Sequence, residues 1–129
     1  MSGSVSPEVE ERLTGEVLPA YLATARDDRP HVAPLWYRYG DGTVEFVTTG
    51  RKLENIRANP RVALAVHKHT SGIPEWSVTL LGTAAIVEDE AETREANGKI
   101  NEKYGAELDA WEENTLVRVN VGSASLRRY

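Results

Sequence analysis

The sequence predicts a mainly β fold, an antiparallel β-barrel that is closed or nearly closed and carries helices on its outside. Early in the chain, segments rich in β-branched and aromatic residues follow one another about 8 to 12 residues apart, as in barrels and sandwiches. Glycine-containing turns separate them, and helices do not alternate with single strands, which argues against a parallel doubly wound sheet. With 129 residues the chain has room for one core, so we expect a single domain, residues 1–129.

Seven segments have the composition of strands, and turns or helices separate most of them. The turn at residues 40–42 (GDG) helps to join the first three, which we expect to form a meander. Residues 68–75 form the longest predicted loop. Gly82 lies where a bulge would help the sheet to curl. The predicted strands are residues 20–25, 31–39, 43–49, 61–67, 76–87, 115–121 and 124–128.

Three helices are predicted from capping and stop residues. Ser6 and Pro7 favour a helix start, Pro60 ends a second helix, and Asp89 caps a third that Gly105 terminates. The predicted helices are residues 7–13, 51–59 and 89–104. The first belongs to an N-terminal lead-in of residues 1–18. The third, together with Gly105, makes a peripheral helix of residues 89–105.

Composition excludes several classes of function. The 15 Lys and Arg against 20 Asp and Glu give a net charge of −5, which argues against nucleic acid or an anionic membrane as a partner. Without cysteine, neither disulfides nor thiolate chemistry is available. Residues 1–7 lack an apolar signal segment and no apolar run is long enough to span a bilayer, so we expect a soluble, cytoplasmic protein that binds small molecules or proteins.

The charges are unevenly distributed along the chain. Residues 51–69 contain five cations and one acid, Glu54, and this segment is suited to holding an anion. Residues 88–113 contain ten acids and three cations, which we interpret as a solvated helix face.

The strongest local signal is the run Thr48, Thr49, Gly50, Arg51, Lys52, where a strand ends and a helix begins. Two hydroxyls, two cations and the free N–H groups of a helix N-terminus all favour a phosphate dianion. An arginine fork beside a lysine suits a terminal phosphate better than a carboxylate. The alternative is an ordinary capped helix start with two solvated cations.

Aromatic residues and histidines are weaker signals. Trp36 and Tyr37, on opposite faces of their strand, and Trp76 can pack against a ring system, but aromatic residues on a barrel more often serve in the core or at an interface. His67 and His69 share a strand face without a third ligand at a suitable spacing, so no metal site is expected. The sequence contains no G-x-S-x-G motif, and no pair of carboxylates is singled out for acid and base catalysis.

Four short motifs in register resemble the pyridoxamine 5'-phosphate oxidase-like superfamily, over roughly residues 20–88. They are residues 28–37 (DRPHVAPLWY), 46–52 (FVTTGRK), 55–62 (NIRANPRV) and 78–84 (VTLLGTA). The resemblance implies a six-stranded FMN-binding split barrel that forms a homodimer, with two flavin sites at the subunit interface.

The resemblance also assigns cofactor-binding residues. The second strand would lie along the isoalloxazine, the end of the third strand and the basic pair would hold the ribityl phosphate, and the partner subunit would contribute the start of the fifth strand. The residues in these three groups are Ala33, Pro34, Leu35 and Trp36; Val47, Thr48, Thr49, Arg51 and Lys52; and Trp76 and Ser77. The oxidase carries an amide side chain where this chain has Ser77.

We therefore predict a flavin-dependent oxidoreductase that acts on an unknown small molecule. FMN is the first choice of cofactor, and an F-420-dependent reductase of the same fold is the alternative. The cofactor supplies the redox chemistry, so no catalytic side chain is required, although His67 or Tyr37 is a candidate proton donor. Because the chain ends at Tyr129, without the longer segment that binds the vitamin phosphate in the oxidase, oxidation of pyridoxamine phosphate is not expected. A third hypothesis is a non-catalytic flavin-binding, haem-binding or redox-sensing module, with His67 or His69 as the axial haem ligand.

Overall fold

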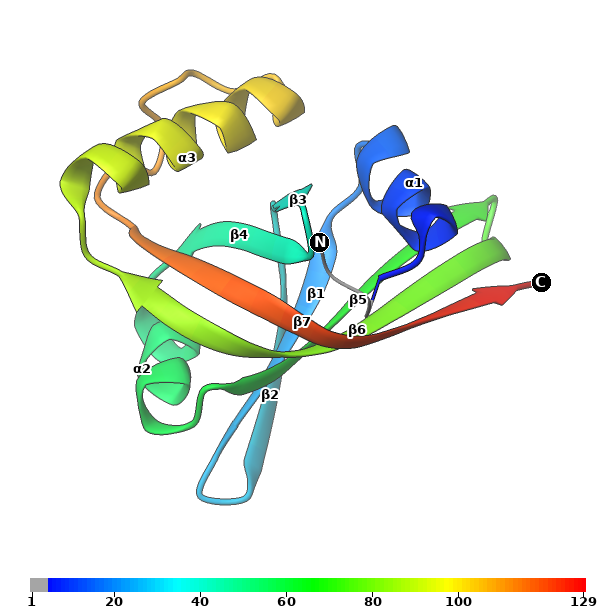
Figure 1. Cartoon of the computed structure of the whole chain (residues 1–129), viewed down its shortest axis with the longest axis horizontal. Coiled ribbons are helices and arrows are strands. Elements are labelled where there is room, and N and C mark those ends of the chain that lie inside the picture. The colour runs from blue at the N-terminus through cyan, green and yellow to red at the C-terminus, as the bar shows by residue number, and fades with distance from the viewer. Residues whose placement is uncertain (1–4) are drawn as a thin grey trace.

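A computed structural model describes residues 5–129, so the first four residues of the predicted lead-in and of the 1–7 segment lie outside the described residues. Seven strands form one antiparallel sheet in the order β2-β1-β5-β6-β7-β4-β3. Figure 1 shows this sheet strongly curved, with the three helices outside it. The strands are β1 (Ala20–Arg26), β2 (Arg29–Leu35), β3 (Arg38–Gly40), β4 (Thr43–Thr48), β5 (Arg61–Thr70), β6 (Ile73–Val87) and β7 (Thr115–Arg128). The split-barrel fold is confirmed, with seven strands where the family resemblance implies six.

The predicted meander is wrong, because the expected strand 31–39 is two strands at opposite edges of the sheet. β2 pairs with β1, as in Ala20 opposite Leu35, whereas among the described residues β3 pairs only with β4. The chain leaves β2 at Trp36 and Tyr37, and the Tyr37 side chain enters the core, where its hydroxyl donates to the Leu13 carbonyl over 2.8 Å. This buried anchor fixes where the chain crosses from one edge of the sheet to the other.

The predicted loop 68–75 is also wrong, because β5 and β6 continue as a hairpin to the pair Thr70 and Ile73. Ser71 and Gly72 form its two-residue turn, both with positive φ (51° and 81°), which matches the twist of paired strands.

The last two strands of the chain, β6 and β7, contain the predicted bulge, but they replace three predicted strands. The pairing of β6 with β7 shifts register between Leu81 and Gly82, as the sequence predicted. A Cβ on Gly82 would lie 2.5 Å from the Asn120 carbonyl oxygen, so only glycine fits there without a shift of the backbone. The two strands predicted at residues 115–121 and 124–128 are the single strand β7, which bends past this bulge.

Local capping sets the ends of the helices. Ser6 accepts a hydrogen bond from the Val9 N–H at α1 (Pro7–Gly15), and Asp89 accepts from the Glu92 N–H at α3 (Glu90–Tyr104). Gly105 ends α3 in the left-handed conformation, with φ 75°. These predicted caps are confirmed. α2 (Gly50–Ala58) lies against β1 and begins one residue before its predicted start.

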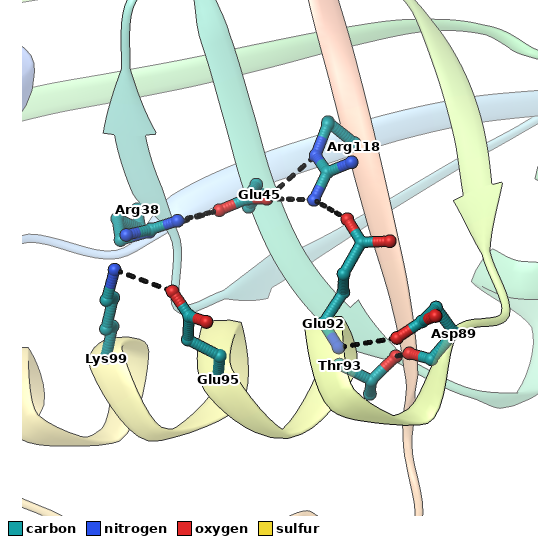
Figure 2. Close-up of polar contacts among 8 residues, drawn as sticks. All are labelled: Arg38, Glu45, Asp89, Glu92, Thr93, Glu95, Lys99 and Arg118. Carbon is teal, nitrogen blue, oxygen red and sulfur yellow. Dashed lines mark hydrogen bonds and ion pairs between the residues drawn. The ribbon is translucent and has the colours of Figure 1, made fainter.

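An ion network joins α3 to the strands, as Figure 2 shows. Glu45 on β4 is buried and contacts Arg38 on β3 and Arg118 on β7, the latter at 2.8 Å. Arg118 also reaches Glu92 on α3 over 3.4 Å. Burial raises the pKa of the Glu45 carboxyl, but the hydrogen bonds and charges of the two arginines outweigh it, so the pKa lies below its usual value. This ion network holds α3 in a defined position over β4 and β7.

The apolar core lies between the curved sheet and α1, and contains Phe46, Leu22 and Leu80 among its most buried side chains. Ala96 and Ile100 on α3 are buried but lie outside this cluster. Over residues 5–129, none of the helices has the length and apolar character needed to cross a bilayer.

Candidate flavin site

The start of α2 has the features of an anion site. Thr49 precedes the helix in an extended conformation (φ −153°), and its hydroxyl makes no capping hydrogen bond. Gly50 follows with a positive φ of 69°, a conformation that glycine adopts without strain. The first turn contains no acid, Arg51 is exposed and Lys52 is half-buried. Within residues 5–129 neither cation forms an ion pair, so both remain available to an anion.

A cleft of about 360 Å³ adjoins this helix start, and several of its residues had no assigned role in the sequence analysis. Its acids, Asp27 and Glu54, lie 3.8 and 3.9 Å from Arg26, in long, exposed contacts that contribute little. The Nδ1 atom of His31 is buried in the cleft wall without a hydrogen-bond partner in residues 5–129. The lining residues are Arg26, Asp27, Arg29, Pro30, His31, Arg51, Glu54 and Asn55. Three guanidinium groups against two weakly engaged carboxylates make this cationic cleft suitable for an anion.

Some of the residues predicted to bind the flavin line a second cavity, of about 200 Å³. Leu35, Trp36 and Val47, all half-buried, meet there with residues of α3 and of the segment after it. The complete lining is Leu35, Trp36, Val47, Ile100, Asn101, Trp111 and Asn114, and it includes no charged side chain. Sequence analysis missed the last four residues because it treated the acidic stretch as a solvated surface. We call this space the uncharged cavity.

Strand β2 connects the cationic cleft to the uncharged cavity. His31 lines the cleft and Leu35 lines the cavity. They lie four residues apart on one face of the strand, with half-buried Ala33 between them. At about 3.3 Å per residue, the two positions are roughly 13 Å apart. Pro34 points to the other face and is exposed.

A stack of aromatic rings fixes Trp36. Its ring lies parallel to that of Tyr104, with centroids 4.7 Å apart and 3° between the planes. The Tyr104 hydroxyl donates to the Leu18 carbonyl over 2.7 Å, and Lys103 Nζ donates to the Tyr37 carbonyl over 3.0 Å. Burial lowers the pKa of Lys103 to about 8. These contacts couple the end of α3 to the end of β2.

The two candidate proton donors, Tyr37 and His67, differ in their contacts. Burial raises the pKa of the Tyr37 hydroxyl well above its usual value, and its proton is already donated to Leu13. The His67 ring lies between those of Tyr21 and His69, at 5.8 and 5.4 Å. Within residues 5–129 the histidines and acids do not gather into a cluster of three or more that could hold a metal ion.

The residues assigned to the partner's site differ in exposure. Trp76 is 6% exposed in the core, with the Arg12 guanidinium 5.8 Å from its ring centre. Ser77 is half-buried, and its Oγ lies 3.5 Å from the Tyr129 hydroxyl. In a single chain, therefore, only Ser77 of this pair is positioned to face a second molecule.

Comparison with known proteins places this architecture among its relatives. A FAD-binding protein from Mesorhizobium loti is 29% identical, with 97% of this chain and 96% of that chain covered and a TM-score of 0.79. An F-420 reductase is 28% identical over 89% of this chain and 94% of its own, with a TM-score of 0.74. The protein RA0666 of Rhizobium meliloti (strain 1021) is 34% identical over 64 residues. These are 49% of this chain and 42% of that curated relative, so the match spans less than half of the relative's length.

The family relationship rests on nearly the whole chain. The sequence profile described as Pyridoxamine 5'-phosphate oxidase matches residues 6–128, which include all seven strands and all but the first and last residues of the described chain. The resemblance in the four motifs and the confirmed barrel agree with this match. The chain therefore belongs to the pyridoxamine 5'-phosphate oxidase family.

Proposed function

We propose that this protein is a flavin-dependent oxidoreductase that holds a phosphorylated flavin along β2 and acts as a homodimer on a small molecule. The observation that carries the proposal is the uncapped start of α2, where Arg51 and Lys52 flank free backbone N–H groups beside the cationic cleft. The similarity to a FAD-binding protein and to an F-420 reductase supports a flavin as the ligand.

The distance along β2 suits such a ligand. With the phosphate at the start of α2, roughly 13 Å of strand separates the cationic cleft from the uncharged cavity. A ribityl chain and tricyclic ring are of similar extent, so the ring would lie beside Ala33, Leu35 and Trp36. The flavin supplies the hydride chemistry when bound, and the chain's residues bind, orient and shield it.

The identity of the flavin depends on the same cleft. FMN, our first choice, carries one phosphate, which the α2 start can bind by itself. Arg26 and Arg29 offer room for further anionic groups, as FAD or the deazaflavin F-420 would bring. Parallel titrations with FMN, FAD and F-420 rank the affinity of the protein for each flavin. The proposal of FMN fails if FMN binds most weakly of the three.

A second copy of the chain is the proposed partner because the outer face of the sheet carries an apolar row. Val32, Ala23, Ala63 and Leu81 lie directly opposite one another on β2, β1, β5 and β6. Val32 is 66% and Leu81 53% exposed, although each lies within a strand. Sedimentation should give a dimer that Leu81→Glu dissociates, whereas a wild-type monomer would contradict this part of the proposal.

The phosphate role is tested by flavin titration of the double variant Arg51→Ala/Lys52→Ala. Each lost charge-assisted hydrogen bond is worth about 1.5–3 kcal/mol, so affinity for FMN should fall at least about tenfold. Arg57→Ala, at the other end of α2 and exposed, is the matched control and should change affinity by less than about twofold. Unchanged affinity in the double variant would remove the phosphate role.

A turnover assay distinguishes a flavin-dependent oxidoreductase from a non-catalytic binding module. The flavin-loaded protein should oxidise NADH, or reduced F-420, with a panel of quinones as acceptors. Tight flavin binding without electron transfer would favour the non-catalytic module, and a Soret band in the purified protein would favour haem bound at His67 or His69.

A further inference from the structure

Two successive side chains of α3 hold the backbone at the point where the chain leaves β2. Tyr37 lies between β2 and β3 and is buried. Its N–H donates to the Tyr104 hydroxyl over 3.4 Å, and its carbonyl accepts from Lys103 Nζ over 3.0 Å. A buried backbone group needs a partner, and here the two side chains provide what a neighbouring strand provides elsewhere in the sheet. Because Lys103 and Tyr104 are the last two residues of α3, this helix end is attached to the crossing point of the chain.

The same helix end fixes the ring of the preceding residue. The Trp36 ring lies parallel to that of Tyr104, with 4.7 Å between the centroids. The Tyr104 hydroxyl accepts from Tyr37 and donates to the Leu18 carbonyl over 2.7 Å, so its ring cannot turn without breaking a hydrogen bond. A ring stacked on an anchored ring has one favoured orientation. Since Trp36 and Leu35 line the uncharged cavity, the end of α3 determines the shape of one of its walls.

The contacts of Lys103 leave its charge without a counter-ion. Its Nζ lies 3.8 Å from the centre of the Tyr37 ring and 5.1 Å from that of the Tyr104 ring. Across residues 5–129 it takes part in no ion pair. Ring faces attract a cation, but burial still lowers the pKa of Lys103 to about 8, so the protonated side chain is held at a cost in stability. Groups held in this way are more frequent at functional sites than elsewhere.

We propose that Lys103 and Tyr104 are positioning residues of the flavin site, which hold Trp36 and the end of β2 in the orientation that the isoalloxazine ring requires. The inference rests on the proposed function, because the ring is expected beside Leu35 and Trp36. Neither positioning residue has to contact the flavin, since both act through the Tyr37 backbone and the Trp36 ring. The charge of Lys103 then contributes to ligand binding and not to the stability of the fold.

The variant Lys103→Met tests this role because it separates ligand affinity from stability. Methionine removes the donor and the charge but retains an apolar chain. Affinity for FMN should fall at least about threefold. The urea midpoint at pH 7 should stay unchanged, because removal of the buried charge offsets the lost hydrogen bond. Lys99→Met, an exposed lysine one turn earlier that pairs with Glu95, is the matched control and should change neither. If Lys103→Met loses stability together with affinity, the residue is merely structural and the proposal is overturned.

Riboflavin, which has the ring but no phosphate, shows which end of the ligand is affected. Lys103→Met should weaken riboflavin and FMN by the same factor, because it acts at the ring. Arg51→Ala/Lys52→Ala should weaken FMN alone. At saturating FMN, the visible absorption spectrum of the bound flavin should differ between wild type and Lys103→Met but not between wild type and Lys99→Met. A loss confined to FMN would indicate a long-range effect of charge on the phosphate and would contradict the positioning role.

Two-dimensional NMR without flavin separates failure of this inference from failure of the proposed function. The side-chain N–H signal of Trp36 should shift in Lys103→Met, while that of Trp76, 6% exposed in the core, serves as the internal control. An unshifted Trp36 signal, or equal flavin affinity of wild type and Lys103→Met, would overturn this inference and leave the proposed function standing. If the Trp36 signal shifts but the wild-type protein binds no flavin, the positioning role falls together with the proposed function.

Discussion

Replacing Glu45 by glutamine should loosen the attachment of α3 to the barrel, because this carboxylate is the centre of the ion network in Figure 2. Removing one partner of a fully buried ion pair costs about 3–5 kcal/mol, whereas an exposed pair is worth about 0.2–1 kcal/mol. The Glu45 side chain is only 9% exposed, but those of Arg38 and Arg118 are 36% and 35% exposed, so water compensates part of the loss. We expect Glu45→Gln to lower the free energy of unfolding by about 2 kcal/mol.

The pH dependence of this loss follows from the direction of the pKa shift. The pKa of Glu45 is lowered from 4.5 in the folded protein, so the unfolded chain takes up this proton first as the pH falls. The stabilisation by Glu45 is thus fully present above about pH 4.5 and is lost as the pH falls through the folded pKa. The difference between wild type and Glu45→Gln should be constant near neutral pH and shrink in acid.

Urea denaturation followed by circular dichroism measures both effects. Glu95→Gln, which removes an exposed pair with Lys99 on α3, is the matched control and should cost less than about 0.5 kcal/mol. The reasoning would be refuted if Glu45→Gln cost no more than this control, or if its cost were the same at about pH 3.5 as at pH 7.

Two further predictions concern backbone packing and a buried lysine. A Cβ on Gly82 would lie 2.5 Å from the Asn120 carbonyl oxygen, so Gly82→Ala should lower the free energy of unfolding by about 3 kcal/mol in urea. Gly98→Ala meets no atom within 4 Å in the middle of α3 and should instead raise it by about 0.5–1 kcal/mol; similar responses would contradict the close approach at the bulge. The pKa of Lys103 is lowered from 10.5 to about 8, so the folded protein releases this proton first, and the stability should rise with pH between these values. NMR titration of the lysine side chains checks this, and a Lys103 that titrates near the usual lysine value of 10.5 would count against it.

The parts of the fold that sequence predicts well are those that neighbouring residues determine. The caps at Ser6, Asp89 and Gly105 depend on residues within one helical turn, and their chemistry is visible in the sequence. The break after β2 has no such signal, because residues 31–39 form an unbroken β-rich run. Its cause is long-range, since β1 and β4 draw the two halves to opposite edges and Tyr37 is buried against Leu13.

The candidate site also has one part that the sequence indicated and one part that it did not. The proposed phosphate site at the start of α2 is contiguous in sequence, so residue types alone indicated it. The uncharged cavity combines β2, β4, α3 and the segment after α3, and its asparagines lie among acids that suggested a solvated helix. The spacing of Asn97, Ile100, Asn101 and Tyr104 does place them on one helix face, and this signal would have identified a packed side of α3.

The position of β2 at one edge of the sheet suits it to the proposed ligand. It is an edge strand, paired only with β1, so one side of its backbone remains free for hydrogen bonds. Pro30 and Pro34 lack N–H groups, which discourages another strand from pairing along that edge. Apart from the missing proline N–H groups, the backbone groups of β2 that point away from β1 stay available between the cationic cleft and the uncharged cavity. An open edge protected in this way favours a small planar ligand over an added strand, because the ligand needs only a few of these groups.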